Sequence, residues 1–161
     1  MITRFALLGL SAALLVGCAS QPKPLQGPFA PITPRDAAET DRTGAAVRWG
    51  GRIVKVEPQP NRTCFEMIAT RLDTFARPYW ATDDVGGRFI ACRIGFYDPA
   101  LFEVNREVTF TGPISGYEMR RIGQYEYRFP VIEADVVYLW PKRERVDVLL
   151  RPEPWPWWGW W

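Results

Sequence analysis

The hydrophobic residues of this chain fall into short runs from Ala46 onward. The runs are rich in Val, Ile, Thr and aromatic residues, and Gly, Pro, Asn and Asp interrupt them at intervals typical of β-strands. The pattern predicts strands over Val47 to Glu57, Thr63 to Asp73, Gly87 to Ile94, Glu107 to Tyr117, Tyr125 to Phe129 and Val131 to Leu139, with a further candidate over Arg145 to Leu150. The folded domain is therefore expected to be mainly β.

The order of these elements indicates the architecture. A helical turn is expected between the third and fourth strands, where Asp98 can cap it and Pro99 can take its first position. About six short strands with one small helix after the third is the order of an oligonucleotide/oligosaccharide-binding (OB) type of barrel, closed or partly open. A β-sandwich is the alternative that the pattern leaves open.

The first 17 residues have the features of a bacterial export signal. Arg4 gives a positive start, and the apolar run from Phe5 to Val16 is too short for a stable transmembrane helix, which needs about 20 residues. The segment Leu15-Val-Gly-Cys18 then matches the lipoprotein box, in which the cysteine thiol accepts diacylglycerol before cleavage. We expect cleavage after Gly17 and a mature chain that begins with lipidated Cys18.

This lipid is the only attached group that the sequence predicts, with diacylglycerol on the Cys18 thiol and an N-acyl chain on its amine. At roughly 0.8 kcal/mol per buried methylene, several acyl chains make the anchor effectively permanent. Ala19 and Ser20 follow, without the aspartate that retains enteric lipoproteins in the inner membrane. We therefore expect the outer membrane, facing the periplasm, as the location and outer-membrane lipid as the first partner.

Prolines dominate the segment after the lipidated cysteine. Five of them between Gln21 and Pro34 favour extended polyproline conformations, which predict a tether that holds the domain off the membrane surface. Thr33, as N-cap before Pro34, predicts a short helix to about Asp41. The chain thus divides into a signal peptide (1–17), a lipidated cysteine and tether with a short helix (18–45), a barrel-like domain (46–150) and a tail (151–161).

Composition and charge exclude several classes of function. The 20 basic and 18 acidic residues are spread along the chain, so no basic footprint for nucleic acid is expected. The chain has no histidine, which removes Ser-His-Asp and Cys-His catalysis and imidazole-ligated zinc, and its three cysteines are too few for a four-thiolate site. We expect no catalytic residue, no metal ligand and no cofactor, and we assign Asp83 and Asp84 to a solvated turn.

Two of the cysteines, Cys64 and Cys92, lie in the second and third predicted strands. An antiparallel pair of strands centred on Pro78 would place them opposite one another, and the oxidising periplasm favours a disulfide. The bridge would close a loop of about 28 residues and stabilise the fold by about 3 to 4 kcal/mol. Two buried free cysteines are the alternative, because cross-strand geometry is demanding.

Other polar and aromatic positions have structural interpretations. Glu66 faces solvent if its neighbours face the core; if its own side is buried, Arg48 or Arg52 is the expected counter-ion. Arg48 and Trp49 could form an exposed patch for a glycan or peptide, against the simpler interpretation of a core tryptophan beside a surface arginine. Trp140 is expected to close the core at the end of the last strand.

The end of the chain combines proline with tryptophan. Five of the eight tryptophans fall in the last seven residues, and prolines at 152, 154 and 156 oppose helix and central strand. Tryptophan prefers the membrane interface, so we expect the tail to dock on the inner leaflet of the outer membrane. Stacking on glycan rings and packing over the barrel mouth are the alternatives. The contact residues would be Trp155, Trp157, Trp158, Trp160 and Trp161.

Motifs between residues 44 and 141, together with the lipoprotein box, resemble the Slp family of outer membrane lipoproteins, the starvation-inducible group. In order, they are Val47-Arg-Trp-Gly-Gly-Arg-Ile53, Thr63-Cys-Phe-Glu-Met-Ile68, Leu72-Asp-Thr-Phe-Ala-Arg-Pro78, Gly87-Arg-Phe-Ile90, Gly95-Phe-Tyr-Asp-Pro99, Val108-Thr-Phe-Thr-Gly112, Tyr127-Arg-Phe-Pro-Val131 and Leu139-Trp-Pro141. The resemblance implies a lipid-anchored protein of starvation or stationary phase without established catalytic activity. We expect a non-catalytic structural or binding accessory of the envelope. The alternatives are a module that binds an envelope glycan, peptide or protein, and an envelope-remodelling enzyme.

Overall fold

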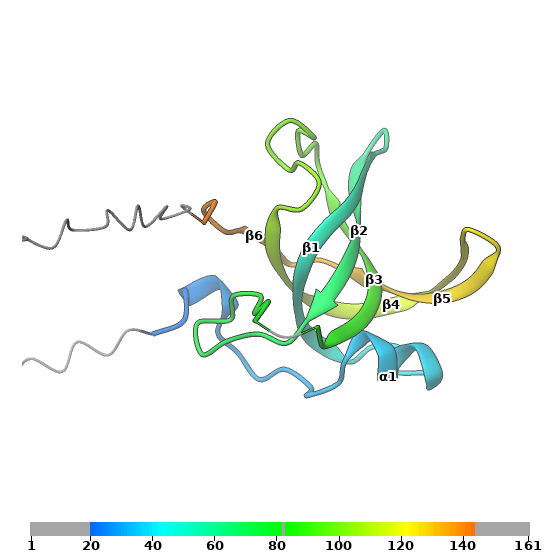
Figure 1. Ribbon diagram of the computed structural model, residues 1–161, viewed down its shortest axis with the longest axis horizontal. Helices are drawn as coiled ribbons and strands as arrows, with labels where there is room; N and C mark the ends of the chain where they lie inside the picture. Colours follow the sequence, from blue (N-terminus) through cyan, green and yellow to red (C-terminus); the bar gives the residue numbers. More distant parts are fainter. Residues whose placement is uncertain (1–19, 82, 144–161) are drawn as a thin grey trace, which may run out of the picture.

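Six strands form one sheet that curls into a barrel (Figure 1). The structure is a computed structural model that describes residues 20–81 and 83–143. Its strands are β1 (Ala46–Pro58), β2 (Arg62–Thr70), β3 (Val85–Ile94), β4 (Glu107–Ile122), β5 (Tyr125–Glu133) and β6 (Val136–Leu139). They follow the order β1-β2-β3-β5-β4-β6, and β4 also pairs with β1, so five strands close into a ring. The expected OB-like barrel is confirmed.

The pairing of β3 with β5 completes the ring. This pair is parallel, whereas every other neighbouring pair is antiparallel. Strand β4 forms the connection between them, pairing with β1 through its first half and with β5 through its second. Strand β6 lies beside β4 outside the ring.

The predicted break between the fifth and sixth strands at Pro130 is wrong. β5 continues through Pro130, and the break falls at Ala134 and Asp135. There the Ala134 N–H donates to the Cys92 carbonyl, and the Asp135 N–H donates to the Thr111 carbonyl. The regular strand is therefore interrupted where the chain stops pairing with β3 and continues along β4. Proline is tolerated because β5 up to this point has β4 on one edge only, which leaves the other edge free of ladder hydrogen bonds.

Other element boundaries also differ from the predictions. β4 extends to Ile122, because its pairing with β5 continues into the tight turn at Gly123, and β2 ends at Thr70. After Asp98 the chain forms turns rather than a helix, although Asp98 Oδ1 does accept a hydrogen bond from the Ala100 N–H. The candidate strand at 145–150 lies outside the described residues.

Aromatic side chains fill the barrel. Phe65 and Phe89 pack against Phe110 with ring centroids 5.4 and 6.0 Å apart, and Trp49 meets Phe89 edge-on at 5.3 Å. The Trp49 indole N–H donates to the Ile32 carbonyl at 2.7 Å, so the polar end of this buried ring has a partner. Trp49 therefore belongs to the core, as the simpler interpretation had it, and not to an exposed patch.

The proline-rich segment lies along the barrel instead of leading away from it (Figure 1). It contains η1 (Lys23–Leu25) and α1 (Pro34–Glu39), and Thr33 caps α1 through a reciprocal capping box with Asp36. Leu25 and Ala37 are fully buried against the sheet. The predicted tether over Gln21 to Pro34 is thus corrected, since isolated apolar residues in this segment pack on the domain. No helix within the described residues is long and apolar enough to cross a bilayer.

Candidate functional site

Both ends of the described chain lie on the same side of the barrel. Figure 1 shows the first and last coloured segments on the left, with the β4–β5 hairpin on the opposite side. One apolar cluster joins them: Leu25 of η1 is buried with Trp140, and Tyr138 of β6 packs against this cluster. We call this region, from η1 to the residues after β6, the chain-end face.

Hydrogen bonds hold the first described residues on this face. Arg48 Nη1 donates to Gln21 Oε1 at 2.7 Å and to the Leu25 carbonyl at 2.8 Å, and Gln26 Nε2 donates to the Gln21 carbonyl at 2.6 Å. Cys18, the predicted lipidation site, lies outside the described residues but only three residues before Gln21. Three residues span at most about 10 Å, so a lipid on Cys18 would lie close to the barrel.

Arginines around the nearly buried Glu107 hold the other end of the chain. Its carboxylate, 8% exposed, pairs with Arg77 Nε at 2.7 Å and with Arg143 Nε at 3.0 Å. Arg77 also donates to the Pro141 carbonyl, and Arg143 donates to the Pro78 carbonyl. These bonds fasten the segment after β6 to the loop that precedes β3.

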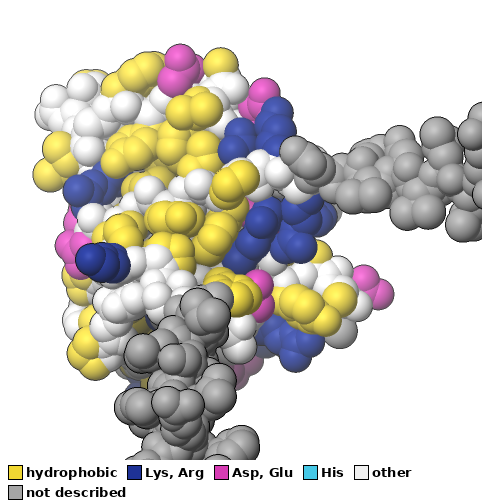
Figure 2. Space-filling view, turned by 90° about the vertical axis from the view of Figure 1, so that its left-hand side faces the viewer, with side chains coloured by type: hydrophobic (Ala, Val, Ile, Leu, Met, Phe, Trp, Pro, Cys, Tyr) yellow, Lys and Arg dark blue, Asp and Glu magenta, His cyan; other side chains and the backbone are white. Residues whose placement is uncertain are grey.

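A cavity of about 500 Å³ adjoins this cluster; we call it the basic cavity. Four of its nine lining residues are cationic and two are anionic: Arg52, Glu103, Val104, Asn105, Arg106, Glu107, Pro141, Lys142 and Arg143. Figure 2 shows Lys and Arg side chains gathered beside the end of the described chain, next to a broad hydrophobic area on the same face. The combination suits an anionic group at an apolar boundary.

A second cavity, of about 290 Å³, lies between the N-terminal segment and the sheet. Its walls include the apolar Ile32 and Leu72 and the charged Arg71 and Asp84. Arg71 stacks on Tyr79, with 4.4 Å between the guanidinium carbon and the ring centroid. Mixed apolar and charged walls of this kind suit a small polar ligand.

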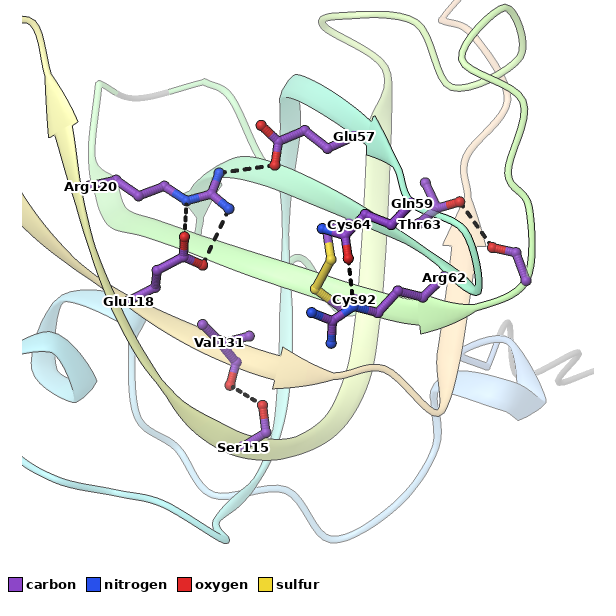
Figure 3. Close-up of a disulfide and its surroundings, with 11 residues drawn as sticks. Glu57, Gln59, Arg62, Thr63, Cys64, Cys92, Ser115, Glu118, Arg120 and Val131 are labelled. Atoms are coloured by element: carbon purple, nitrogen blue, oxygen red, sulfur yellow. Dashed lines mark hydrogen bonds and ion pairs between the residues drawn. A yellow bond between two sulfur atoms is a disulfide. The ribbon is translucent and has the colours of Figure 1, made fainter.

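The carboxyl groups with shifted pKa values favour the ionised form. Hydrogen bonding from Thr33 lowers the pKa of Asp36, and a hydrogen bond from Lys142 lowers the pKa of Glu103. The Lys55 ammonium lowers the pKa of Glu57. Arg120, which Figure 3 shows beside the Glu57 carboxylate, lowers this pKa further. A general acid at neutral pH needs the opposite shift. Within residues 20–81 and 83–143, no group of three or more Cys, Asp or Glu side chains is arranged to hold a metal ion.

Cys64 and Cys92 lie directly opposite one another on β2 and β3, and a disulfide joins them (Figure 3). Both side chains are 2% exposed. Glu66, on the same side of β2, pairs with Arg88 Nη1 at 2.7 Å. The proposed counter-ions for Glu66, Arg48 and Arg52, are wrong because the partner comes from β3, and Arg52 instead stacks on Trp80.

The disulfide gives a prediction for the folded domain. A chain with Cys18→Ser should show no free thiol after denaturation until it is reduced, because the remaining two cysteines are bridged. Reduction should lower the stability by about 3 to 4 kcal/mol and lower the melting temperature accordingly. The Cys64→Ser/Cys92→Ser variant is the matched control and should melt with the reduced protein. Two reactive thiols in the unreduced, denatured chain would show that no bridge forms.

The remaining predicted site residues fall outside the described structure. These are Cys18 and the five tail tryptophans Trp155, Trp157, Trp158, Trp160 and Trp161. Asp83 and Asp84 are exposed in the loop before β3, in keeping with a solvated turn. The structure brings together residues that sequence analysis had left apart, namely Arg52, Arg106 and Lys142 at the basic cavity. Their separation along the chain gave no local signal of a common site.

Comparisons with known proteins agree on one family. The model of the outer membrane lipoprotein Slp family matches residues 15–161, a range that includes the lipoprotein box. The uncharacterized lipoprotein YeaY of Escherichia coli K12 is 32% identical over 155 residues, covering 92% of this chain and 79% of the relative. The outer membrane protein Slp of the same strain is 27% identical over 151 residues, with 91% and 79% covered. An uncharacterized protein of Haemophilus influenzae is 30% identical over 132 residues, with 78% and 70% covered. No solved structure matches the chain.

Proposed function

The chain belongs to the outer membrane lipoprotein Slp family, and from that premise we propose that it is a non-catalytic accessory of the cell envelope whose domain lies directly on the inner leaflet of the outer membrane. In this proposal Cys18 carries diacylglycerol and an N-acyl chain, and the protein uses no other cofactor. The chain-end face then lies against the bilayer, and the β4–β5 hairpin points into the periplasm.

The fixed position of Gln21 is the observation that carries this proposal. A free polyproline tether over Gln21 to Pro34 would let the domain stand about 40 Å from its anchor, at about 3.1 Å per residue. The hydrogen bonds to Gln21 shorten the free link to the three preceding residues, or about 10 Å. A domain on so short a link contacts the surface that holds its anchor.

The chemistry of the domain supports a role without catalysis. The whole chain has no histidine, and the described carboxyl groups with shifted pKa values are held in the ionised form by hydrogen bonds and cations. The two arginines that pair with Glu107 likewise fasten the segment after β6. These charged groups thus stabilise the folded domain. An envelope-remodelling hydrolase of the Ser-His-Asp or Cys-His type would need a histidine, which the chain lacks.

Depth-dependent quenching tests the orientation. A fluorescent amino acid at position 142, on the chain-end face, and another at position 124, in the β4–β5 hairpin, would be introduced separately into the acylated protein in vesicles. We expect spin-labelled headgroups to quench the probe at 142 strongly and the probe at 124 weakly. Equal quenching at both positions, or stronger quenching at 124, would contradict the orientation.

The tryptophan-rich tail is expected to add to membrane contact. In a non-lipidated chain that begins at Ala19, truncation after Pro154 should lower binding to liposomes and barely change the melting temperature, because tryptophan favours the interface and the prolines keep the tail out of regular structure. Sedimentation with liposomes and thermal melting measure the two effects. Unchanged binding with a loss of several degrees of stability would instead assign the tail to the barrel mouth.

The cavity of about 290 Å³ favours an accessory that binds a component of the envelope over one with a purely structural role. Its mixture of apolar and charged walls would suit a cell-wall glycan or peptide, and Arg71 presents a cation at its wall. NMR titration with a disaccharide-peptide fragment of peptidoglycan tests this. Shifts confined to the cavity that disappear with Arg71→Ala support binding there, whereas shifts that are absent or equal in both proteins exclude it.

A further inference from the structure

We propose that the basic cavity is a binding site for the phosphate headgroup of an anionic phospholipid in the leaflet that holds the anchor. This inference rests on the proposed orientation, because that orientation places the cavity at the bilayer surface. It adds a specific chemical contact to the lipid anchor.

The charges around the cavity leave a positive excess. Glu107 is shared by two arginines, Arg77 and Arg143, and Glu103 pairs with Lys142 at 2.9 Å. Within the described part of the chain, neither Arg52 nor Arg106 forms an ion pair with a carboxylate. Five cations therefore surround two carboxylates, if Arg77 is counted with the lining residues. The single negative charge of a phosphodiester would offset part of this excess.

The cationic groups are held in place by their surroundings. The Arg52 guanidinium stacks on the Trp80 ring, with 4.2 Å from its central carbon to the ring centroid, and has no hydrogen-bond acceptor among residues 20–81 and 83–143. Arg106 is fixed by hydrogen bonds from its guanidinium to the Leu101 and Trp140 carbonyls. A stacked guanidinium with open donors is well suited to bind phosphate oxygens in a bidentate manner.

One side of the cavity can adapt to a ligand. Lys142 and Glu103 are 65% and 50% exposed, and an ion pair at such exposure stabilises a protein only weakly. Lys142 can therefore exchange its carboxylate partner for a phosphate at little cost. The lining residue Val104 is 60% exposed and adds an apolar edge, as expected where a headgroup meets the acyl region.

A lipid is the favoured source of the phosphate for a geometric reason. The short link to Cys18 keeps the chain-end face at the leaflet, where tethering gives headgroups a high effective concentration. Even a weak site would then be occupied by lipid. The volume of about 500 Å³ falls within the usual range of ligand cavities, about 300 to 1,000 Å³.

Lipid retention by the acylated, full-length mature protein tests the assignment. The protein would be reconstituted in vesicles of equal parts phosphatidylglycerol and phosphatidylcholine, extracted gently, and analysed by native mass spectrometry. We expect several-fold preferential retention of phosphatidylglycerol, and at least about a fivefold loss of that preference in Arg52→Gln/Lys142→Gln. The control Arg62→Gln/Arg121→Gln removes the same charge from exposed residues outside the cavity and should retain the preference.

Different results would contradict the site, the lipid assignment and the orientation. Equal retention of both lipids by the unaltered protein, or an equal loss in the control variant, would overturn the site. A second arm adds about 20 mM inorganic phosphate to vesicles of phosphatidylcholine alone. The melting temperature of the protein would be measured in these vesicles and in the vesicles that contain phosphatidylglycerol. An equal rise in melting temperature in both would show a site for free phosphate and overturn the lipid assignment. Failure of the orientation itself would show separately, as lost quenching at position 142.

Discussion

Cys18→Ala is expected to abolish acylation and leave unprocessed precursor in the cell. In a lipoprotein box the cysteine thiol accepts diacylglycerol and the signal peptidase recognises the lipidated cysteine, so removal of a lipidated Cys18 would block both steps. Labelling with radioactive palmitate and the mobility of the protein on a gel measure the two effects. Cys64→Ser/Cys92→Ser, which removes the other two cysteines, should take up label normally. Equal label in Cys18→Ala would contradict lipidation at this residue.

The second large effect is expected at Gly51, where the backbone of β2 leaves no room for a side chain on β1. A Cβ atom at this position would lie 1.9 Å from the Ile68 carbonyl oxygen and 2.8 Å from its carbon. These are backbone atoms, so the strands would have to separate. We expect Gly51→Ala to cost about 3 kcal/mol or more and to lower the melting temperature by at least about 10 °C.

Gly116→Ala is the matched control for this substitution. Gly116 also lies in a barrel strand, and its added Cβ would meet no atom within 4 Å. Its melting temperature should be unchanged or slightly higher, because alanine restricts the unfolded chain. If Gly51→Ala and Gly116→Ala melted together, β1 and β2 would not be packed as closely as the structure has them.

Local patterns predicted much of this fold. Thr33 before Pro34 indicated the helix start, and the capping box with Asp36 shows why. The number and order of the strands indicated an OB-like barrel, because each apolar run is bounded by turn residues that mark where a strand begins and ends. The placement of Cys64 opposite Cys92 also followed from strand spacing, since an antiparallel pair centred on Pro78 places residues equally distant from that centre opposite one another.

Features that depend on distant contacts could not be predicted in the same way. Leu25 is buried and Ile32 packs against the core, but they lie in a segment without hydrophobic periodicity, so nothing local distinguished it from a free tether. The ion pair of Glu66 with Arg88 depended on which neighbouring strand would face the carboxylate. The basic cavity joins Arg52 to residues about 50 and 90 positions later, so it exists only once β1, β4 and the segment after β6 meet.

The distance between the domain and the bilayer is the central claim, and neutron reflectometry measures it directly. The acylated protein would be inserted into a supported bilayer, and the protein layer would be profiled along the membrane normal. We predict that protein density begins at the headgroups, with a solvent-filled gap of no more than about 10 Å, as the three residues before Gln21 allow. A solvent gap of about 40 Å, the reach of an extended polyproline tether, would contradict a domain that lies on the membrane.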